Sequence, residues 1–181
     1  MPGITQIRLA GLGGQGVLLA GLLLGQAGVV QGKYVAGSNA YGAQVRGSGC
    51  KSEVVFSDCP IDFPHVITPD ILVVMSQTTY DEYSKDMATG GLILYDASQI
   101  TSRKEIKARQ IGIPATDAAL NRLGNEQAAN IILLGSLVAL TGLVSPEAVE
   151  QAMEQHVSSR FQKLNLEAFT AGRELGRQDH G

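Results

Sequence analysis

A short glycine-rich stretch near the amino terminus of this 181-residue chain could hold a ligand. Residues 11–16 read Gly-Leu-Gly-Gly-Gln-Gly, which fits the Gly-x-Gly-x-x-Gly spacing of dinucleotide-binding turns. Glycine accepts positive φ angles and lets backbone N–H groups approach an anion at the positive end of a helix. The candidate binding residues for a phosphate, or for the backbone of a partner protein, are therefore Gly11, Gly13, Gly14, Gln15 and Gly16.

The charged residues of the amino-terminal third are mostly basic. Arg8, Lys33, Arg46 and Lys51 all precede Glu53, which is the first acidic residue of the chain. The net charge of the whole chain is −3, which argues against general affinity for nucleic acids. An anion site at the glycine turn explains this asymmetry, and so does a chance distribution of charge around an apolar core.

The residues around the turn do not favour the usual catalytic or metal sites. A nicotinamide site needs a carboxylate about 20 residues beyond the glycines, and residues 36–39 read Ala-Gly-Ser-Asn there. The chain has no Gly-x-Ser-x-Gly motif, and its histidines are scattered. Two cysteines, Cys50 and Cys59, are too few for an iron–sulfur cluster. Cys50 is either a reactive thiol beside Lys51 or, more simply, a buried inert one. We expect no cofactor and no metal to be bound by this chain alone.

The pattern around the turn predicts an α/β fold. We expect a three-layer sandwich, with helices on both faces of an open, mainly parallel twisted sheet and with one antiparallel strand. Strands are expected over 4–10, 34–37, 51–58, 71–75, 92–95 and 106–113, with 51–58 as the antiparallel one. Helices are expected over 15–31, 76–87, 125–141 and 165–177, with another that begins at Ser145. The helix over 15–31 is apolar all round, so both its sides should be covered.

A stretch without hydrophobic period, residues 38–49, is predicted as an irregular loop with a function. It contains the other two candidate binding residues, Tyr41 and Arg46. We expect both to lie beside the glycine turn, at an interface with a partner chain.

Further short motifs are spread along nearly the full chain. With the glycine turn they are Tyr41-Gly42, Arg46-Gly47, Ser57-Asp58, Pro69-Asp70, Asn130, Leu134-Gly135, Asn165, Ala168 and Gly172. Their order and spacing resemble the gamma subunit of the 2-oxoacid:ferredoxin oxidoreductases, so residues 1–181 are expected to form one domain of that type. The chain departs from the commoner family pattern at Gln44, where many relatives have glutamate, and at Ser48, where they have glycine. The role of Arg46 therefore stays open between an anion contact and a structural tie.

The resemblance implies a subunit that performs no chemistry alone. Enzymes of this family oxidatively decarboxylate a 2-oxoacid with coenzyme A, giving an acyl-CoA, carbon dioxide and reduced ferredoxin. Thiamine diphosphate lies in the alpha and beta subunits, and iron–sulfur clusters lie in other chains, such as the delta type. The gamma subunit packs near the route of coenzyme A, which it could contact. Pyruvate, 2-oxoglutarate and branched-chain 2-oxoacids all remain possible substrates.

Two other functions are compatible with the sequence. One is a self-sufficient NAD(P)- or other nucleotide-binding Rossmann-like protein, and the other is an architectural domain with an empty glycine turn. The chain shows no signal peptide and no apolar run long enough for a bilayer, so we expect a cytoplasmic protein without membrane contact. Charged residues make up only 17% of the chain, which predicts that a partner covers part of its surface or that the isolated chain forms a homodimer.

Overall fold

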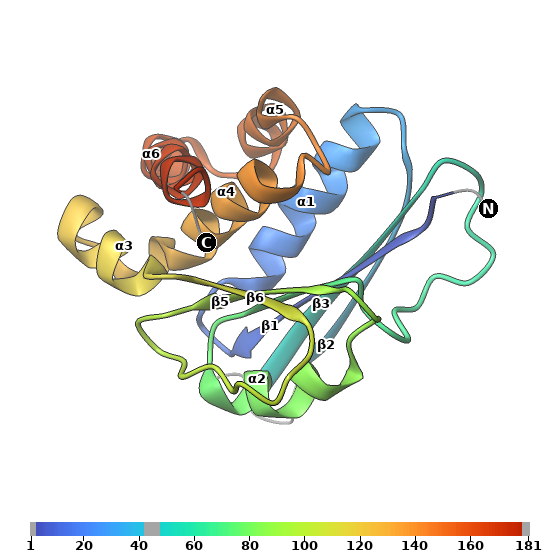
Figure 1. Cartoon of the computed structure of the whole chain (residues 1–181). Helices are drawn as coiled ribbons and strands as arrows, with labels where there is room; N and C mark the ends of the chain where they lie inside the picture. The colour runs from blue at the N-terminus through green and yellow to red at the C-terminus, as the bar shows by residue number, and fades with distance from the viewer. Residues whose placement is uncertain (1–2, 42–47, 179–181) are drawn as a thin grey trace.

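The computed structural model describes residues 3–41 and 48–178 and shows an open sheet with helices on both faces (Figure 1). The strands are β1 (Thr5–Leu12), β2 (Tyr34–Tyr41), β3 (Gly49–Ser57), β4 (Ile71–Val74), β5 (Leu92–Asp96) and β6 (Arg109–Ile113). They form one six-stranded sheet in the order β2-β3-β1-β4-β5-β6. Among the described strands, β3 alone points in the direction opposite to the others, so its pairs with β1 and β2 are antiparallel and the remaining pairs are parallel. The predicted α/β class and the open, mainly parallel sheet are confirmed.

The helices are distributed unevenly over the two faces of the sheet. They are α1 (Val17–Val30), α2 (Gln77–Tyr83), α3 (Ala115–Leu123), α4 (Ala129–Thr141), α5 (Pro146–His156) and α6 (Ser159–Gly176), with short 3-10 helices η1 (Ser84–Asp86) and η2 (Glu126–Ala128). Helices α1 and α3 to α6 lie on one face, and α2 lies on the other (Figure 1). The main core therefore lies between α1, α4 and the sheet. Within the described residues, no helix has the length and apolar character needed to cross a membrane.

The antiparallel strand β3 lies inside the sheet, between β1 and β2, and not at one side of it. Helix α1 rests directly on β3, because a side chain at Gly21 would collide with Ser52 and one at Gly28 would collide with Phe56. Glycines in the middle of a helix are unfavourable by about 1 kcal/mol each relative to alanine, and this close contact explains why they are present.

The prediction of an irregular loop over residues 38–49 is wrong at both of its ends. Residues 38–41 complete β2, and β3 begins at Gly49. Asn39 pairs with Ser52, and Tyr41 pairs with Cys50. The hydrophobic alternation is missing because β2 is the edge strand and most of its side chains from residue 37 onward are exposed on both faces. Arg46 lies outside the described residues.

Helix α3 was not predicted, and the strand expected over 106–113 begins only at Arg109. Pro114 occupies the N-cap position of α3 and makes no side-chain capping bond. The carboxylate of Asp96, at the end of β5, accepts hydrogen bonds from the Ala115 N–H at 3.1 Å and the Thr116 N–H at 3.2 Å. A cap supplied by a distant strand leaves no signal in the sequence around the helix.

Helices α4 and α6 approach each other at small residues. A side chain at Gly172 would collide with the backbone of Ile132, and one at Gly135 would collide with the backbone of Phe169. The Ser136 hydroxyl donates a hydrogen bond to the Gly172 carbonyl at 2.8 Å. The last long helix is therefore held against the centre of the helical layer.

Candidate functional site

The glycine turn connects the end of β1 to the first residue of α1. Gly14 has φ 101° and Gly16 has φ 74°, which are conformations that other residues rarely adopt. Gly16 is the N-cap of α1 and supplies no side-chain capping bond. The turn therefore places backbone N–H groups at the positive end of a helix, as predicted from its spacing.

Two glycines of the turn are needed for close packing. A side chain at Gly11 would meet the Gln15 carboxamide at 2.7 Å and Val17 at 2.8 Å. A side chain at Gly16 would collide with Asn130, whose amide donates a hydrogen bond to the Gly16 carbonyl at 2.9 Å. Gly14 differs, because the space around its missing side chain is open. Of these three glycines, Gly14 is the one that could face a ligand or a partner.

The side chain of Gln15 links the end of β1 to the residue that follows β4. Its oxygen accepts a hydrogen bond from the Leu12 N–H at 2.7 Å, and its amide donates one to the Met75 carbonyl at 3.1 Å. It thereby bridges the carboxyl ends of β1 and β4, where dinucleotides bind in many open α/β sheets. The prediction that Gln15 is a binding residue applies at most to its backbone, because its side chain holds the turn together.

Two backbone donors of the turn have partners within the chain. The Gly13 N–H donates to the Ser48 carbonyl at 2.9 Å, and the Gln15 N–H donates to the Leu12 carbonyl at 3.1 Å. Within the described parts of the chain, no acceptor is found for the N–H groups of Gly14 and Gly16. These two groups are the donors that remain for an anion.

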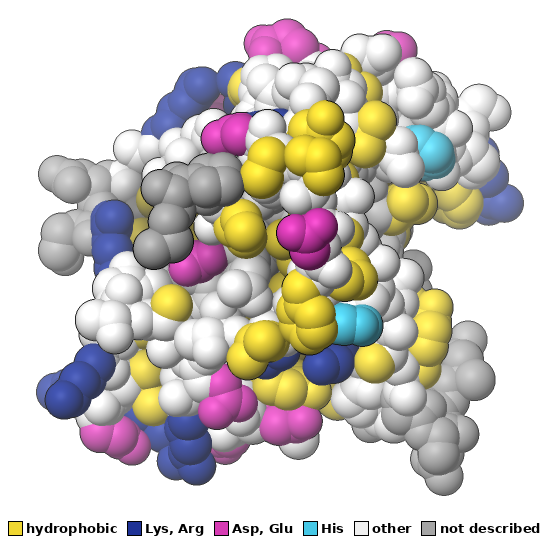
Figure 2. Space-filling model, turned by 90° about the vertical axis from the view of Figure 1, so that its right-hand side faces the viewer, with side chains coloured by type: hydrophobic (Ala, Val, Ile, Leu, Met, Phe, Trp, Pro, Cys, Tyr) yellow, Lys and Arg dark blue, Asp and Glu magenta, His cyan; other side chains and the backbone are white. Residues whose placement is uncertain are grey.

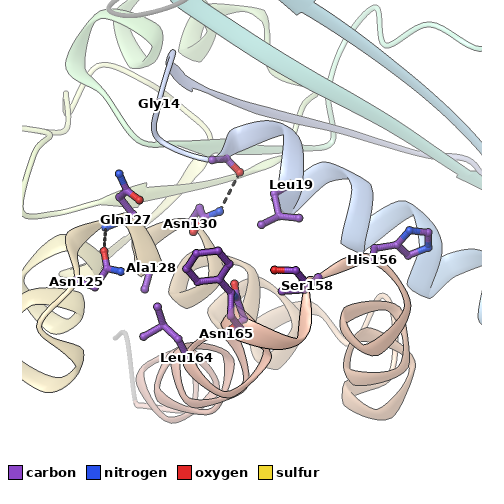
Figure 3. A pocket seen from close by; sticks show the side chains of 13 residues that line it. Gly14, Leu19, Asn125, Gln127, Ala128, Asn130, His156, Ser158, Leu164 and Asn165 are labelled. Carbon is purple, nitrogen blue, oxygen red and sulfur yellow. Dashed lines mark hydrogen bonds between the residues drawn. The ribbon is translucent and has the colours of Figure 1, made fainter.

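A cavity of about 310 Å³ lies beside the turn, on the side of α4, α5 and α6 (Figure 3). The N-cap residues of α1, α4 and α6, which are Gly16, Ala128 and Ser158, all line it, and none of them makes a side-chain capping bond. The positive ends of three helix dipoles therefore meet here, and the carboxyl end of α5, at His156 and Val157, also lines the cavity. The described lining contains no Asp or Glu; besides the N-cap residues it consists of Gly14, Leu19, Asn125, Gln127, Asn130, His156, Val157, Phe161, Leu164 and Asn165. The cavity is suited to a negatively charged ligand with an apolar part.

The sequence did not predict this cavity, although some of its residues were noticed. Asn130 and Asn165 were quoted as motif residues without a position in space. Both are buried amides, Asn130 in the apolar helix α4 and Asn165 on the buried side of the amphipathic helix α6, and such residues need hydrogen-bond partners. These two amides were therefore the signal in the sequence that could have indicated the cavity. The turn between α5 and α6, which supplies Ser158, has no comparable pattern.

Tyr41 lies in the same row of the sheet as the glycine turn. It pairs with Cys50, which in turn pairs with Gly11, so about 10 Å of sheet separate Tyr41 from Gly11. Its side chain is 68% exposed at the edge of the sheet.

Burial raises the pKa of the Cys50 thiol, which favours the buried, inert form of this cysteine.

The three described cations of the amino-terminal third, Arg8, Lys33 and Lys51, do not surround the glycine turn. Arg8 and Lys51 both form ion pairs with Glu53, at 2.8 and 3.0 Å, and both lie over the ring of Tyr83. Lys33 follows the opposite end of α1. Of the described residues, backbone dipoles and not these side chains would bind an anion at the turn.

The carboxylate of Glu53 is buried between these two cations. Burial raises its pKa, but hydrogen bonds from Lys51 and Arg8, together with their charges, lower it below the ordinary value of 4.5. A lowered pKa in the folded state adds stability above the ordinary pKa, and this stability is lost as the pH falls through the lowered value.

We expect Glu53→Gln to lower the free energy of unfolding by about 2 kcal/mol at pH 7, because it leaves Arg8 buried without a counter-charge. The difference from the parent should shrink as the pH falls below 4.5, the ordinary value for this group. Urea denaturation of both proteins between neutral and acidic pH measures it. A difference that stays constant over this range would contradict the assignment.

Among the described residues, no group of His, Cys, Asp and Glu side chains could hold a metal ion.

The comparisons with known proteins agree with a role in a larger assembly. Residues 6–175 match the family described as pyruvate ferredoxin/flavodoxin oxidoreductase. The chain is 42% identical to 2-oxoglutarate synthase subunit KorC of Methanocaldococcus jannaschii, over 96% of this chain and 94% of that protein.

Two further similarities extend this result. The chain is 37% identical to ketoisovalerate oxidoreductase subunit VorA of Methanothermobacter thermautotrophicus, over 97% of this chain but only 37% of VorA. It also superposes on the crystal structure of the keto/oxoacid ferredoxin oxidoreductase gamma subunit of Geobacter sulfurreducens. That comparison has a TM-score of 0.86 and 38% identity, and it covers 96% of this chain and 97% of that one.

Proposed function

The chain belongs to the pyruvate ferredoxin/flavodoxin oxidoreductase family, and we propose that it is the gamma-type subunit of a 2-oxoacid:ferredoxin oxidoreductase. The assembled enzyme oxidatively decarboxylates a 2-oxoacid with coenzyme A and yields an acyl-CoA, carbon dioxide and reduced ferredoxin. The observation that carries the proposal is the match to a gamma subunit over nearly the whole length of both chains. We regard residues 1–181 as one domain of this type.

We assign the chemistry of the reaction to companion chains. Alpha- and beta-type subunits would hold thiamine diphosphate, and a delta-type subunit would hold iron–sulfur clusters and pass electrons to ferredoxin. The glycine turn and the cavity beside it support a role in binding and positioning. The relative from M. jannaschii is a subunit of 2-oxoglutarate synthase, so 2-oxoglutarate is the first substrate to test.

Coenzyme A is the anionic ligand we propose for the glycine turn and the cavity. Its phosphates would accept hydrogen bonds from the N–H groups of Gly14 and Gly16, at the positive end of α1. The N-cap residues of α4 and α6 line the same cavity. The volume of about 310 Å³ is at the lower end of small-molecule sites, so it suits one part of coenzyme A. Tyr41 and Arg46 would contribute where the partner subunit meets the turn.

A self-sufficient dinucleotide enzyme fits the site less well. Residues 36–39 supply no carboxylate for a ribose, and they belong to the edge strand β2 and not to a strand beside β1. The carboxamide of Gln15 bridges the carboxyl ends of β1 and β4, where a dinucleotide would lie.

Reconstitution tests the proposed function. The tagged chain is co-expressed with the companion subunits encoded in the same organism, and the purified assembly is assayed for dye or ferredoxin reduction that depends on both 2-oxoacid and coenzyme A. We expect turnover only when this chain is present, and none from the isolated chain. An assembly that works at the full rate without it, or a chain that binds no companion, would refute the proposal.

A further inference from the structure

The outer edge of β2 is unpaired among the described residues. Strand β2 (Tyr34–Tyr41) stands at the end of the sheet, and β3 is its neighbour on the inner side. In an edge strand about half of the backbone N–H and C=O groups point away from the sheet, where another extended chain can bind them. An eight-residue strand is long enough for such pairing.

This edge lacks the features that usually prevent pairing. Its sequence, Tyr-Val-Ala-Gly-Ser-Asn-Ala-Tyr, contains no charged residue and no proline. The opposite edge of the sheet, β6, has only five residues and begins with Arg109. Natural sheets generally protect long edges with charges, prolines or bulges. An unprotected edge of this length is therefore typical of a strand that is covered in the assembled protein.

An apolar shelf, formed by Leu22 and Val29 of α1, lies beside this edge. Gly25 packs over Val35 of β2, and a side chain there would lie 3.7 Å from Val35. Leu22 and Val29 are three positions before and four after Gly25, so they flank it on the same side of the helix. They are 43% and 54% exposed, so the prediction that α1 is covered on both sides is wrong here. Figure 2 looks onto the side at the right of Figure 1, where α1 ends, and shows hydrophobic side chains gathered along the middle of that face, while the shelf itself is defined by the exposure of Leu22 and Val29.

We propose that a strand of a partner subunit of the same oxidoreductase adds to the outer edge of β2 and packs apolar side chains against the shelf. This inference rests on the proposed function. Main-chain hydrogen bonds to β2 would supply affinity, and alternate side chains of the added strand would meet Leu22 and Val29. Because β2 and the shelf are uncharged, the added strand is uncharged and carries aliphatic or aromatic residues on the side that faces α1.

Two observations favour a partner subunit over a second copy of this chain. The chain matches only 37% of the VorA polypeptide, so in that relative the equivalent domain is covalently joined to a larger part of the protein. The carboxyl end of β2 also leads to the candidate site, since Tyr41 lies in the same sheet row as Gly11. A strand bound along β2 would bring the partner next to the glycine turn.

Hydrogen exchange in the reconstituted oxidoreductase tests this contact. We expect the outward-facing amides of residues 34–41 to exchange at least tenfold more slowly in the assembly than in the isolated chain. The double variant Leu22→Glu, Val29→Glu should reduce recovery of the partner subunits at least tenfold. The matched control Leu120→Glu changes an equally exposed leucine on α3 and should assemble like the parent.

The outcomes separate this inference from the proposed function. An active assembly in which the amides of residues 34–41 exchange as fast as in the isolated chain overturns the contact and leaves the function intact. A dimeric isolated chain whose β2 amides are already protected, and which becomes monomeric in the double variant, also overturns it, because the occupant is then a second copy. A chain that assembles with nothing contradicts both. Circular dichroism of the variants identifies any loss through misfolding.

Discussion

Gly14→Asp is expected to lower kcat/KM for coenzyme A in the assembled oxidoreductase by about 100-fold, which corresponds to about 2.7 kcal/mol. The new carboxylate would occupy the open space above the turn, next to the unpaired N–H groups at the start of α1. It would accept their hydrogen bonds itself and repel a phosphate group. Steady-state kinetics with coenzyme A as the varied substrate measures the effect.

Gly32→Asp is the matched control for this variant. Gly32 also has a positive φ, 75°, and open space around its missing side chain, but it lies beyond the opposite end of α1. Both substitutions place a residue with a side chain at positive φ, which costs at least about 1–2 kcal/mol, while only Gly14→Asp places a charge at the turn. Equal kinetic effects from the two variants would rule out the glycine turn as an anion site.

Gly172→Ala is expected to lower the free energy of unfolding by about 3 kcal/mol. The added methyl group would collide with the backbone of Ile132, so α4 and α6 would have to separate. The hydrogen bond from Ser136 to the Gly172 carbonyl would lengthen at the same time. Urea denaturation followed by circular dichroism measures the loss.

The same substitution at Gly25 should have the opposite sign. A methyl group there would lie 3.7 Å from Val35, which is ordinary van der Waals contact. Because alanine is the better helix former, Gly25→Ala should raise the free energy of unfolding by about 0.5–1 kcal/mol. If both variants were stabilised equally, helix propensity and not the close approach of α4 and α6 would control the effect.

The sequence predicted the elements whose signals are local. Ser145 and Pro146 begin α5 as expected, and the Ser145 hydroxyl accepts a hydrogen bond from the Ala148 N–H at 3.2 Å. Ser76 caps α2 in the same way, through the Thr79 N–H. The position of the glycine turn between β1 and α1 could be predicted, because its glycine spacing and the two flanking apolar runs all lie within 30 residues of sequence. Local patterns of this kind can be interpreted without knowing the tertiary structure.

The parts that were missed depend on residues distant in sequence. Helix α3 is capped by Asp96, which belongs to another strand, and the end of β2 is ordered only by pairing with β3. The cavity combines the turn with residues near Asn130 and Ser158, which only the fold brings together. Two of the amino-terminal cations, Arg8 and Lys51, gave a misleading indication, because the sequence does not show that Glu53 binds them.

The central position of β1 has a consequence for synthesis of the chain. Strand β1 leaves the ribosome before β3 and β4, which pair with it on either side, so both of its edges wait for residues 49–74. At about 5–20 residues per second, this interval lasts several seconds. During it the nascent chain exposes an apolar strand and an apolar helix, which makes it a natural client for chaperones that bind at the ribosome exit.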